Sequence, residues 1–298
     1  MNDYKLKERE ELLIARGYNY QDVIELCSFD INNLELIVQR IFDDIRKDCK
    51  MVNNPVSIFI GGQPGSGKSV EAYRIKKNYN DDGIIIINLD NYRSYHPNYK
   101  RMEELIKKHW EGQIETNNNS MGNDIADFTH YFASVVSDKI FKLSSKIIDN
   151  KGYNIIFDWG MRLPLEPLSI MEELYKKGYT INVKFVVVYE KISREACNLR
   201  AMYNNQHILR KVCDDFHNLC VNSLPDSAKT IYSVGTDKGI INNFSLIDRN
   251  NKVIWDKNSN NDIKDVYYNY LHNDIYNNYE NNLDDVIIIC NLESKGFL

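Results

Sequence analysis

Apolar positions along the chain follow two spacings, one typical of amphipathic helices and one typical of buried strands. Residues 33–47 carry apolar side chains at helical spacing and, with the rest of residues 3–50, predict helices. The β-branched run at 56–62 ends in glycines and predicts a buried strand. Residues 68–79 then predict a helix, and 83–90 a second buried strand.

Strands and helices continue to alternate through the middle of the chain. Helices are predicted at 103–113 and 128–150, and a further helix at 169–179 separates two strands at 153–158 and 182–190. Strands that alternate with helices favour a mainly parallel sheet covered by helices on both faces. The pattern therefore predicts an α/β fold.

The last part of the chain has weaker patterns. Helices are predicted at 191–203 and near 210–222, followed by a β-hairpin at 244–256 with Asn250 and Asn251 at its turn. The Asn-rich sequence from 258 onward predicts either a helix or a loosely ordered appendage.

Residues 62–69 read G-Q-P-G-S-G-K-S, which fits the pattern G-x-x-x-x-G-K-[ST] between a predicted strand and a predicted helix. Glycines let backbone N–H groups turn inward around an anion, and the start of a helix favours phosphate. Lys68 can reach the outer phosphates of a nucleotide, and Ser69 can offer its hydroxyl to Mg²⁺. A glycine-rich connector without a ligand is the alternative. The predicted nucleotide-binding residues are Gly62, Gln63, Pro64, Gly65, Ser66, Gly67, Lys68 and Ser69.

Asp90 ends the second predicted strand, on the sheet edge where ligands gather in parallel sheets. A carboxylate there can orient a substrate hydroxyl and accept its proton during attack on a γ-phosphate. The alternative is that Asp90 only caps a helix that starts at Asn91.

Asp158 ends the third predicted strand, and its carboxylate could lie near Mg²⁺ or the waters of the ion. Arg162 follows four residues later on the same edge and could pair with a phosphate of the substrate, or form a surface ion pair.

Four basic residues lie around the segment between the fourth strand and the hairpin. In small-molecule kinases this segment often carries arginines that neutralise the charge of the transferring phosphoryl group, although each such residue is more often a solvated surface residue. His217, on an amphipathic stretch, is interpreted as a packed, hydrogen-bonded histidine. The four basic residues are Arg194, Arg200, Arg210 and Lys211.

Charge and composition narrow the possible partners. The formal net charge of −5 argues against broad binding of nucleic acid. No stretch reaches the roughly 18–20 apolar residues of a membrane span, and the N-terminus lacks the apolar core of a signal peptide, so we expect a soluble, cytoplasmic protein. The six cysteines contain no C-x-x-C pair and predict neither disulfides nor a zinc site.

The chain resembles the zeta toxins, the kinases of bacterial toxin–antitoxin pairs. The resemblance begins at "GGQPGSGKS" and continues through "LDNYRSYHPNY", where Asp90 stands six positions before His96-Pro97. The segments "KGYNIIFDWGMR", "KKGYTINVKFVVVYEKIS" and "RKVCDDFHNLCVNSLP" follow in the order of the family, over about residues 35–257. The spacing of Asp90 and His-Pro and the ordered later segments make the match more specific than the phosphate loop alone.

Zeta toxins transfer the γ-phosphate of ATP to a sugar hydroxyl of UDP-N-acetylglucosamine, which starves cell-wall synthesis. The resemblance implies a P-loop kinase-like three-layer sandwich, bound ATP and Mg²⁺, and an antitoxin partner. We expect N-terminal helices packed on the core at 1–50, a P-loop kinase domain at 51–257 and a C-terminal appendage at 258–298, with residues 1–34 and 258–298 largely outside the resemblance. The implied catalytic residues are Asp90 as base, Lys68 as phosphate clamp, Arg200 and Arg210. The implied substrate contacts are Asp90, His96, Asp158, Arg162 and Asp138. The implied metal ligands are Ser69 and Asp158.

The chain departs from the family after the third strand, where Asp158-Trp159-Gly160 replaces the usual Glu-Gly-Thr. These positions line the sugar side in the family, so three functions stay open. The first is a UDP-N-acetylglucosamine kinase. The second is a P-loop kinase for an antibiotic, a dinucleotide or a nucleic-acid end, since Trp159 could stack on a base or ring. The third is a non-catalytic, ATP-gated regulatory module, against which Asp90 with His96-Pro97 argues.

Overall fold

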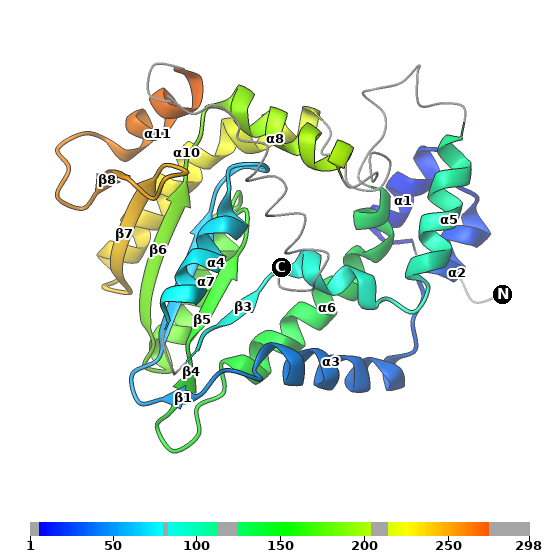
Figure 1. The fold of residues 1–298 in the computed structure, drawn as a ribbon, viewed down its shortest axis with the longest axis horizontal. Coiled ribbons are helices and arrows are strands. Elements are labelled where there is room, and N and C mark those ends of the chain that lie inside the picture. The colour runs from blue at the N-terminus through cyan, green and yellow to red at the C-terminus, as the bar shows by residue number, and fades with distance from the viewer. Residues whose placement is uncertain (1–5, 80–82, 112–123, 204–213, 274–298) are drawn as a thin grey trace.

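A six-stranded sheet forms the centre of the computed structural model, which describes residues 6–79, 83–111, 124–203 and 214–273 (Figure 1). The strand order is β3-β5-β2-β6-β7-β8, and all neighbouring pairs are parallel except β7 and β8. The mainly parallel sheet predicted from the sequence is thus confirmed. The strands are β2 Val56–Gly61, β3 Ile85–Ile87, β5 Ile155–Asp158, β6 Thr180–Val186, β7 Ile241–Ile247 and β8 Val253–Asp256.

Side chains of β2 alternate between two apolar clusters, one on each face of the sheet. Ile58 and Ile60 pack with Ala72 of α4 (Lys68–Asn78). Phe59 belongs to the larger cluster on the other face. This alternation covers both faces with helices and gives a three-layer α/β sandwich. The larger cluster takes side chains from α3 (Ile31–Ile45), α6 (Asp124–Ser144), α7 (Leu165–Lys176), α10 (Asp214–Asp237) and α11 (Ile263–His272).

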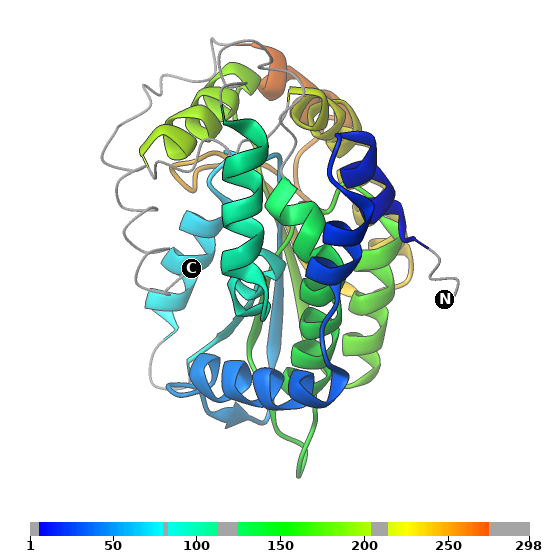
Figure 2. The same cartoon turned by 90° about the vertical axis from the view of Figure 1, so that its right-hand side faces the viewer.

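Three helices gather beside the N-terminal half of α6, at one end of the molecule and away from the sheet (Figures 1 and 2). They share a separate apolar cluster with that half of α6. The fully buried Asp124 carboxylate ties them together, because it accepts hydrogen bonds from Arg16, Tyr18 and Trp110 at 2.6–2.7 Å. The three helices are α1 (Glu8–Ala15), α2 (Tyr20–Cys27) and α5 (Tyr99–Trp110).

Helix α6 starts and ends earlier than predicted, at 124–144 instead of 128–150. The sequence after it turns back through Asp149 and Asn150, both with positive φ, and pairs β4 (Gly152–Tyr153) with β1 (Met51–Val52). Short Asp and Asn side chains tolerate the left-handed conformation that this turn requires, so the last residues of the predicted helix form a turn instead.

Helix α10 continues through Pro225 to Asp237, well beyond the predicted 210–222. Proline in a helix interior costs about 3 kcal/mol because it removes a hydrogen bond. Leu224, Ala228 and Ile231 recur at helical spacing and are fully buried, so packing on the sheet extends the helix past the proline.

The β-hairpin lies where the sequence predicted it, with Asn250 and Asn251 in the turn between β7 and β8. Among the helices of the described ranges, none combines the length and apolar character needed to cross a bilayer.

Helix α11 packs on the same face of the sheet as α10. Asp262 caps its first turn by accepting from the Lys264 N–H. Ile263, Tyr267 and Leu271 are buried in the larger cluster, at intervals of four residues that place them along one side of the helix.

We predict that Leu271→Ala lowers the free energy of unfolding by about 2–5 kcal/mol, because a fully buried leucine leaves a cavity. Tyr268→Ala, on the exposed side of α11, is the control and should change it by less than about 0.5 kcal/mol. Urea unfolding measures both. Equal, small effects would show that α11 does not contribute to the core in solution.

Candidate functional site

The loop between β2 and α4 has the backbone of a phosphate cradle. Gly62, Gly65 and Gly67 all have positive φ, a conformation that L side chains rarely adopt. A Cβ on Gly62 would also lie 2.5 Å from the Val186 carbonyl oxygen, and one on Gly65 would collide with the Ser193 carbonyl. Only glycine fits at these two positions, so the tight loop at the start of α4 depends on them.

Lys68 and Gln63 hold this loop together. The Lys68 ammonium donates to the Gln63 carbonyl at 3.0 Å, so the side chain folds back over the loop. The buried Gln63 side chain donates to the Val188 carbonyl at 2.6 Å, just beyond the end of β6. The loop is therefore anchored to the next strand, and the lysine lies where the outer phosphates of a nucleotide would enter.

The strand register brings Asp158 beside this loop. In β5, Asp158 pairs with Ile60 of β2, and in β3, Ile87 pairs with Phe157, so Asn88 follows at the same edge. One oxygen of the Asp158 carboxylate accepts from the Ser69 hydroxyl at 2.7 Å and from the Asn88 side-chain amide at 2.8 Å. Three chain segments that are distant in sequence thus meet at one carboxylate.

Burial raises the pKa of Asp158 above its ordinary value of 3.8. The Lys68 charge and the hydrogen bonds from Ser69 and Asn88 act in the opposite direction, and the negative charge of Asp90 raises the pKa further. A cation at this position would remove the cost of burying the carboxylate charge.

Ser69 and Asp158 present the hard oxygen donors that Mg²⁺ prefers. Within the described ranges, no group of three or more His, Cys, Asp or Glu side chains could hold a metal. A Mg²⁺ ion held by Ser69 and Asp158 would therefore take its other ligands from phosphates and water, which is usual for this ion.

Asp90 lies in the short 3₁₀ helix η1 (Leu89–Tyr95), next to this cluster. Asn88 caps η1, since its side-chain oxygen accepts from the Asp90 N–H at 2.9 Å, so Asp90 does not serve as the cap. The Asp90 side chain is 75% exposed and pairs with Arg93 at 2.7 Å. Asn88 therefore connects the exposed Asp90 to the buried Asp158 through its two side-chain atoms.

Helix α6 borders η1. Arg93 donates to the Ala126 carbonyl at 2.8 Å and to the Thr129 hydroxyl at 3.1 Å. His130 follows Thr129 on α6. Burial lowers its pKa, and the positive charges of Arg9 and Arg93 lower this pKa further. The Ala126 carbonyl and the Thr129 hydroxyl make the wall of α6 polar where it contacts η1.

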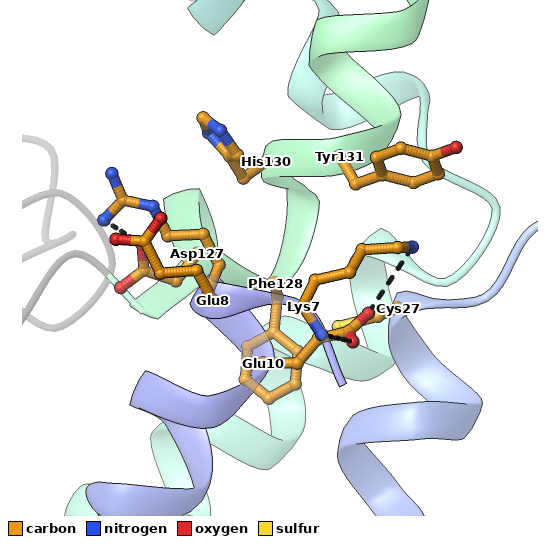
Figure 3. A pocket seen from close by; sticks show the side chains of 9 residues that line it. Lys7, Glu8, Glu10, Cys27, Asp127, Phe128, His130 and Tyr131 are labelled. Carbon is orange, nitrogen blue, oxygen red and sulfur yellow. Dashed lines mark hydrogen bonds and ion pairs between the residues drawn. The ribbon is translucent and has the colours of Figure 1, made fainter. Parts of the chain in front are cut away.

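A hollow of about 220 Å³ lies between α1 and α6, lined by His130, Asp127 and Tyr131 among others (Figure 3). An ion pair between Arg9 and Asp127 at 3.2 Å crosses one side of it, and burial raises the pKa of the Cys27 thiol to about 12. Arg9 and Asp127 thus pair between the two helices, whereas Lys7 and Glu10 pair at the start of α1.

His96 is buried beneath η1 and packs edge-on against Phe29 and Phe132. One ring nitrogen accepts from the Asn98 N–H at 3.1 Å, and burial lowers the pKa of His96 to about 4. The ring is thus neutral at physiological pH and stabilises the turn between η1 and α5.

Arg162 and Asp138 belong to different segments of the fold. Arg162 is half-buried in the loop after β5, on the edge that carries Asp158. Asp138 is exposed and pairs with Lys142 at 2.7 Å. Because it is nine residues, about 13 Å, along α6 from Thr129 and on the opposite side of the helix, the structure does not bring it to the Asp90 cluster.

The basic residues beyond β6 are only partly described. Arg200 belongs to α8 (Glu190–Tyr203), and Arg210 and Lys211 lie outside the described residues. Arg194 donates to Asn218 of α10 at 2.7 Å. His217 is buried and hydrogen-bonded to Ser193 at 2.9 Å, which confirms the interpretation as a packed histidine.

Sequence reasoning missed Asn88, Arg93 and Thr129, which connect the predicted residues to one another. The available signal was the position of Asn88 and Arg93 on either side of Asp90 in the same short segment. For Thr129 there was none, because its contact depends on how α6 packs on η1.

Known proteins resemble this chain over most of its length. The family model described as "Zeta toxin" matches residues 39–260. The chain is similar to "Toxin PezT" of Streptococcus pneumoniae serotype 4 (23% identity over 243 residues, 80% of this chain and 85% of that protein) and to "Toxin zeta" of Enterococcus hirae (26% over 208 residues, 68% of this chain and 63% of that protein). It thus spans most of PezT but under two thirds of the Enterococcus protein.

A solved structure from the PezAT chromosomal toxin–antitoxin system of Streptococcus pneumoniae has the same fold. The TM-score is 0.64 at 19% identity, covering 91% of this chain and 97% of the other. The P-loop kinase-like fold class implied by the sequence is confirmed.

We predict that Asp158→Asn raises the free energy of unfolding of the ligand-free protein at neutral pH, because the amide accepts a hydrogen bond without burying a charge. In the wild type, the pKa of Asp158 is higher in the folded protein than in the unfolded chain. The stability that protonated Asp158 contributes is therefore complete below about pH 3.8, and it is lost as the pH rises through the pKa of Asp158 in the folded protein. Urea unfolding across this pH range measures the loss, which should be absent in the variant.

Asp43→Asn is the control with the opposite sign. Hydrogen bonds from Gln39 and Arg46 lower the pKa of the exposed Asp43, so its charged form contributes stability that is lost as pH falls. If Asp158→Asn instead destabilises the protein at neutral pH, burial of the Asp158 charge is not a cost to the folded state.

Proposed function

This chain belongs to the zeta toxin family, and we propose that it transfers the γ-phosphate of ATP to a sugar hydroxyl of UDP-N-acetylglucosamine. Proteins of this family are generally kinase-type phosphotransferases. One observation carries the proposal: Asn88 joins the buried Asp158–Ser69 pair at the phosphate loop to the exposed Asp90.

The phosphate loop would bind the triphosphate through its backbone N–H groups, with Lys68 against the outer phosphates. Ser69 and Asp158 would hold Mg²⁺, which neutralises charge on the β- and γ-phosphates when bound. The observation that supports this role is that the Ser69 hydroxyl at the start of α4 and the Asp158 carboxylate at the end of β5 lie 2.7 Å apart.

Asp90 would orient the acceptor hydroxyl and accept its proton while the oxygen attacks the γ-phosphorus and the bond to the β-phosphate breaks, leaving ADP. Its high exposure supports this role, because a base must meet a substrate that arrives from solvent. Arg200 and Arg210 are proposed to neutralise the transferring group, as the resemblance implies.

The proposed acceptor contacts differ in their support. Arg162 is half-buried on the edge that carries Asp158, where it could pair with a diphosphate. His96 would act from beneath η1, since its ring is buried. Asp138, exposed and ion-paired with Lys142, gains no support from its position.

A different acceptor is the second candidate. Trp159 and Gly160 stand where the family usually has Gly-Thr, and the Trp159 ring is half-buried against the larger apolar cluster. A changed wall on the sugar side favours a changed sugar or another hydroxyl compound. We also propose an antitoxin partner, by analogy with the toxin–antitoxin system of the structural relative, and a cytoplasmic location, where both nucleotides are made.

Mass spectrometry of products formed from ATP and a panel of nucleotide sugars, dinucleotides, antibiotics and oligonucleotides tests the acceptor. The proposal expects a phosphorylated UDP-N-acetylglucosamine. A product only from another compound would replace the acceptor, and ATP binding without any transfer would favour the regulatory module.

We predict that Asp90→Asn lowers kcat by about 10²–10⁴-fold, the usual contribution of a general base, while the Kd for ATP stays within about threefold. Single-turnover transfer and calorimetric titration with ATP measure the two effects. Asp43→Asn is the matched control, since Asp43 also pairs with an arginine three residues later but lies on α3, outside the predicted site. A near-normal rate in Asp90→Asn would exclude Asp90 as the base.

A further inference from the structure

We propose that Arg93 is a positioning residue that fixes Asp90 against α6, and that the N-terminal helices therefore set the place of the base. This inference rests on the proposed function, in which Asp90 accepts the proton. Neither Arg93 nor the helices before residue 39 belong to the residues predicted to touch ATP or acceptor.

One guanidinium spans two elements. Its Nε donates to the Asp90 carboxylate at 2.7 Å, and its Nη1 donates to the Ala126 carbonyl at 2.8 Å and the Thr129 hydroxyl at 3.1 Å. The Arg93 side chain is 14% exposed, whereas that of Asp90 is 75% exposed. A largely buried arginine thus restrains an exposed carboxylate, and the planar guanidinium fixes the angle between the two sets of bonds.

Thr129 is prepared to accept from Arg93. It is fully buried, and its hydroxyl donates to the Ile125 carbonyl at 2.5 Å, one turn earlier on α6. Since a hydroxyl has one proton, the Arg93 bond falls on its lone pairs. The donor and the acceptor of each hydrogen bond that links η1 to α6 through Arg93 are therefore fixed.

An exposed aspartate on a short 3₁₀ helix needs such a restraint. A general base works with its oxygen about 2.6–3.2 Å from the oxygen that carries the proton, and a displacement of about 1 Å can cost about 10²-fold in rate. Asn88 fixes the backbone of Asp90, and Arg93 ties its carboxylate to a second element, the wall of α6.

The pair Asp43–Arg46 has the same spacing on an exposed surface. Arg46 donates through Nε at 2.9 Å and Nη2 at 2.6 Å, both to one oxygen of Asp43. Both side chains are more than 40% exposed, so water competes for the guanidinium even though Tyr153 also lies close to it. The spacing of three residues alone therefore does not make a positioning residue; a buried guanidinium does.

The same stretch of α6 is also held by Arg16, the residue that follows α1. Arg16 pairs with Asp124 at 2.6 Å and Asp127 at 2.7 Å, on either side of the Ala126 carbonyl that receives Arg93. The family match begins at residue 39, so α1 and α2 lie outside it. Their role, in this proposal, is to hold the frame on which Arg93 sets Asp90.

Arg93→Lys and Arg46→Lys form the test pair. Lysine keeps the charge but has one nitrogen, so it cannot reproduce the planar fork that bonds Asp90 and α6 together. We expect Arg93→Lys to lower kcat by about tenfold or more, with the KM for ATP within about twofold, and Arg46→Lys to change neither. Hydrogen exchange of residues 88–96 in the ligand-free protein should become faster in Arg93→Lys alone.

A second pair keeps the proposal testable if Arg93→Lys folds poorly. Thr129→Val removes the hydroxyl that accepts from Arg93 at similar side-chain volume, and it should lower kcat. Thr129→Ser keeps a hydroxyl and should retain most of the wild-type kcat. Unchanged kcat and unchanged exchange in Arg93→Lys, or an equal rise in the KM for ATP, would overturn the inference while leaving the proposed function intact. If the wild type transfers no phosphate, the proposed function fails, and exchange of residues 88–96 still decides whether Arg93 restrains this segment.

Discussion

The site depends on the hydrogen bonds that Ser69 and Asn88 donate to the buried carboxylate of Asp158. This carboxylate lies at the carboxyl end of β5, where burial disfavours its charge, and it receives hydrogen bonds from Ser69 of the phosphate loop and Asn88 of the segment after β3. A buried carboxylate without such partners would be costly, so the fold brings donors from both neighbouring strand ends to it. The same bonds set the distance between the phosphate loop and Asp90.

Two halves of the molecule meet at η1. The sheet supplies the phosphate loop and Asp158, through backbone geometry and strand register. The helical wall of α6, held by Asp124 and Arg16, supplies the contact that restrains Asp90 through Arg93. In the proposed function, phosphate would be bound by main-chain N–H groups, which tolerate changes of side chain, whereas the acceptor would be bound by side chains. Such a division would let the phosphate loop keep its pattern beside an altered Asp158-Trp159-Gly160 segment.

Burial and charge together separate residues that look alike in the sequence. Asp90 and Asp43 each precede an arginine by three residues, yet one arginine is buried against α6 and the other is largely exposed. Asp138 was placed at the site by resemblance, but it lies on the outer side of α6 with Lys142. Helical periodicity located α6 without indicating which of its sides faces η1.

Local patterns in the chain were enough to predict the strand–loop–helix of the phosphate cradle, the mainly parallel sheet, the hairpin at Asn250-Asn251 and the family. Each of these depends on short-range spacing or on glycines with positive φ. Packing in three dimensions was needed to show that α10 continues past Pro225, that Asn88 bridges Asp90 and Asp158, and that Thr129 receives Arg93. These features depend on which buried faces meet, and contacts between residues 30 or more positions apart are set by packing, which local spacing does not encode.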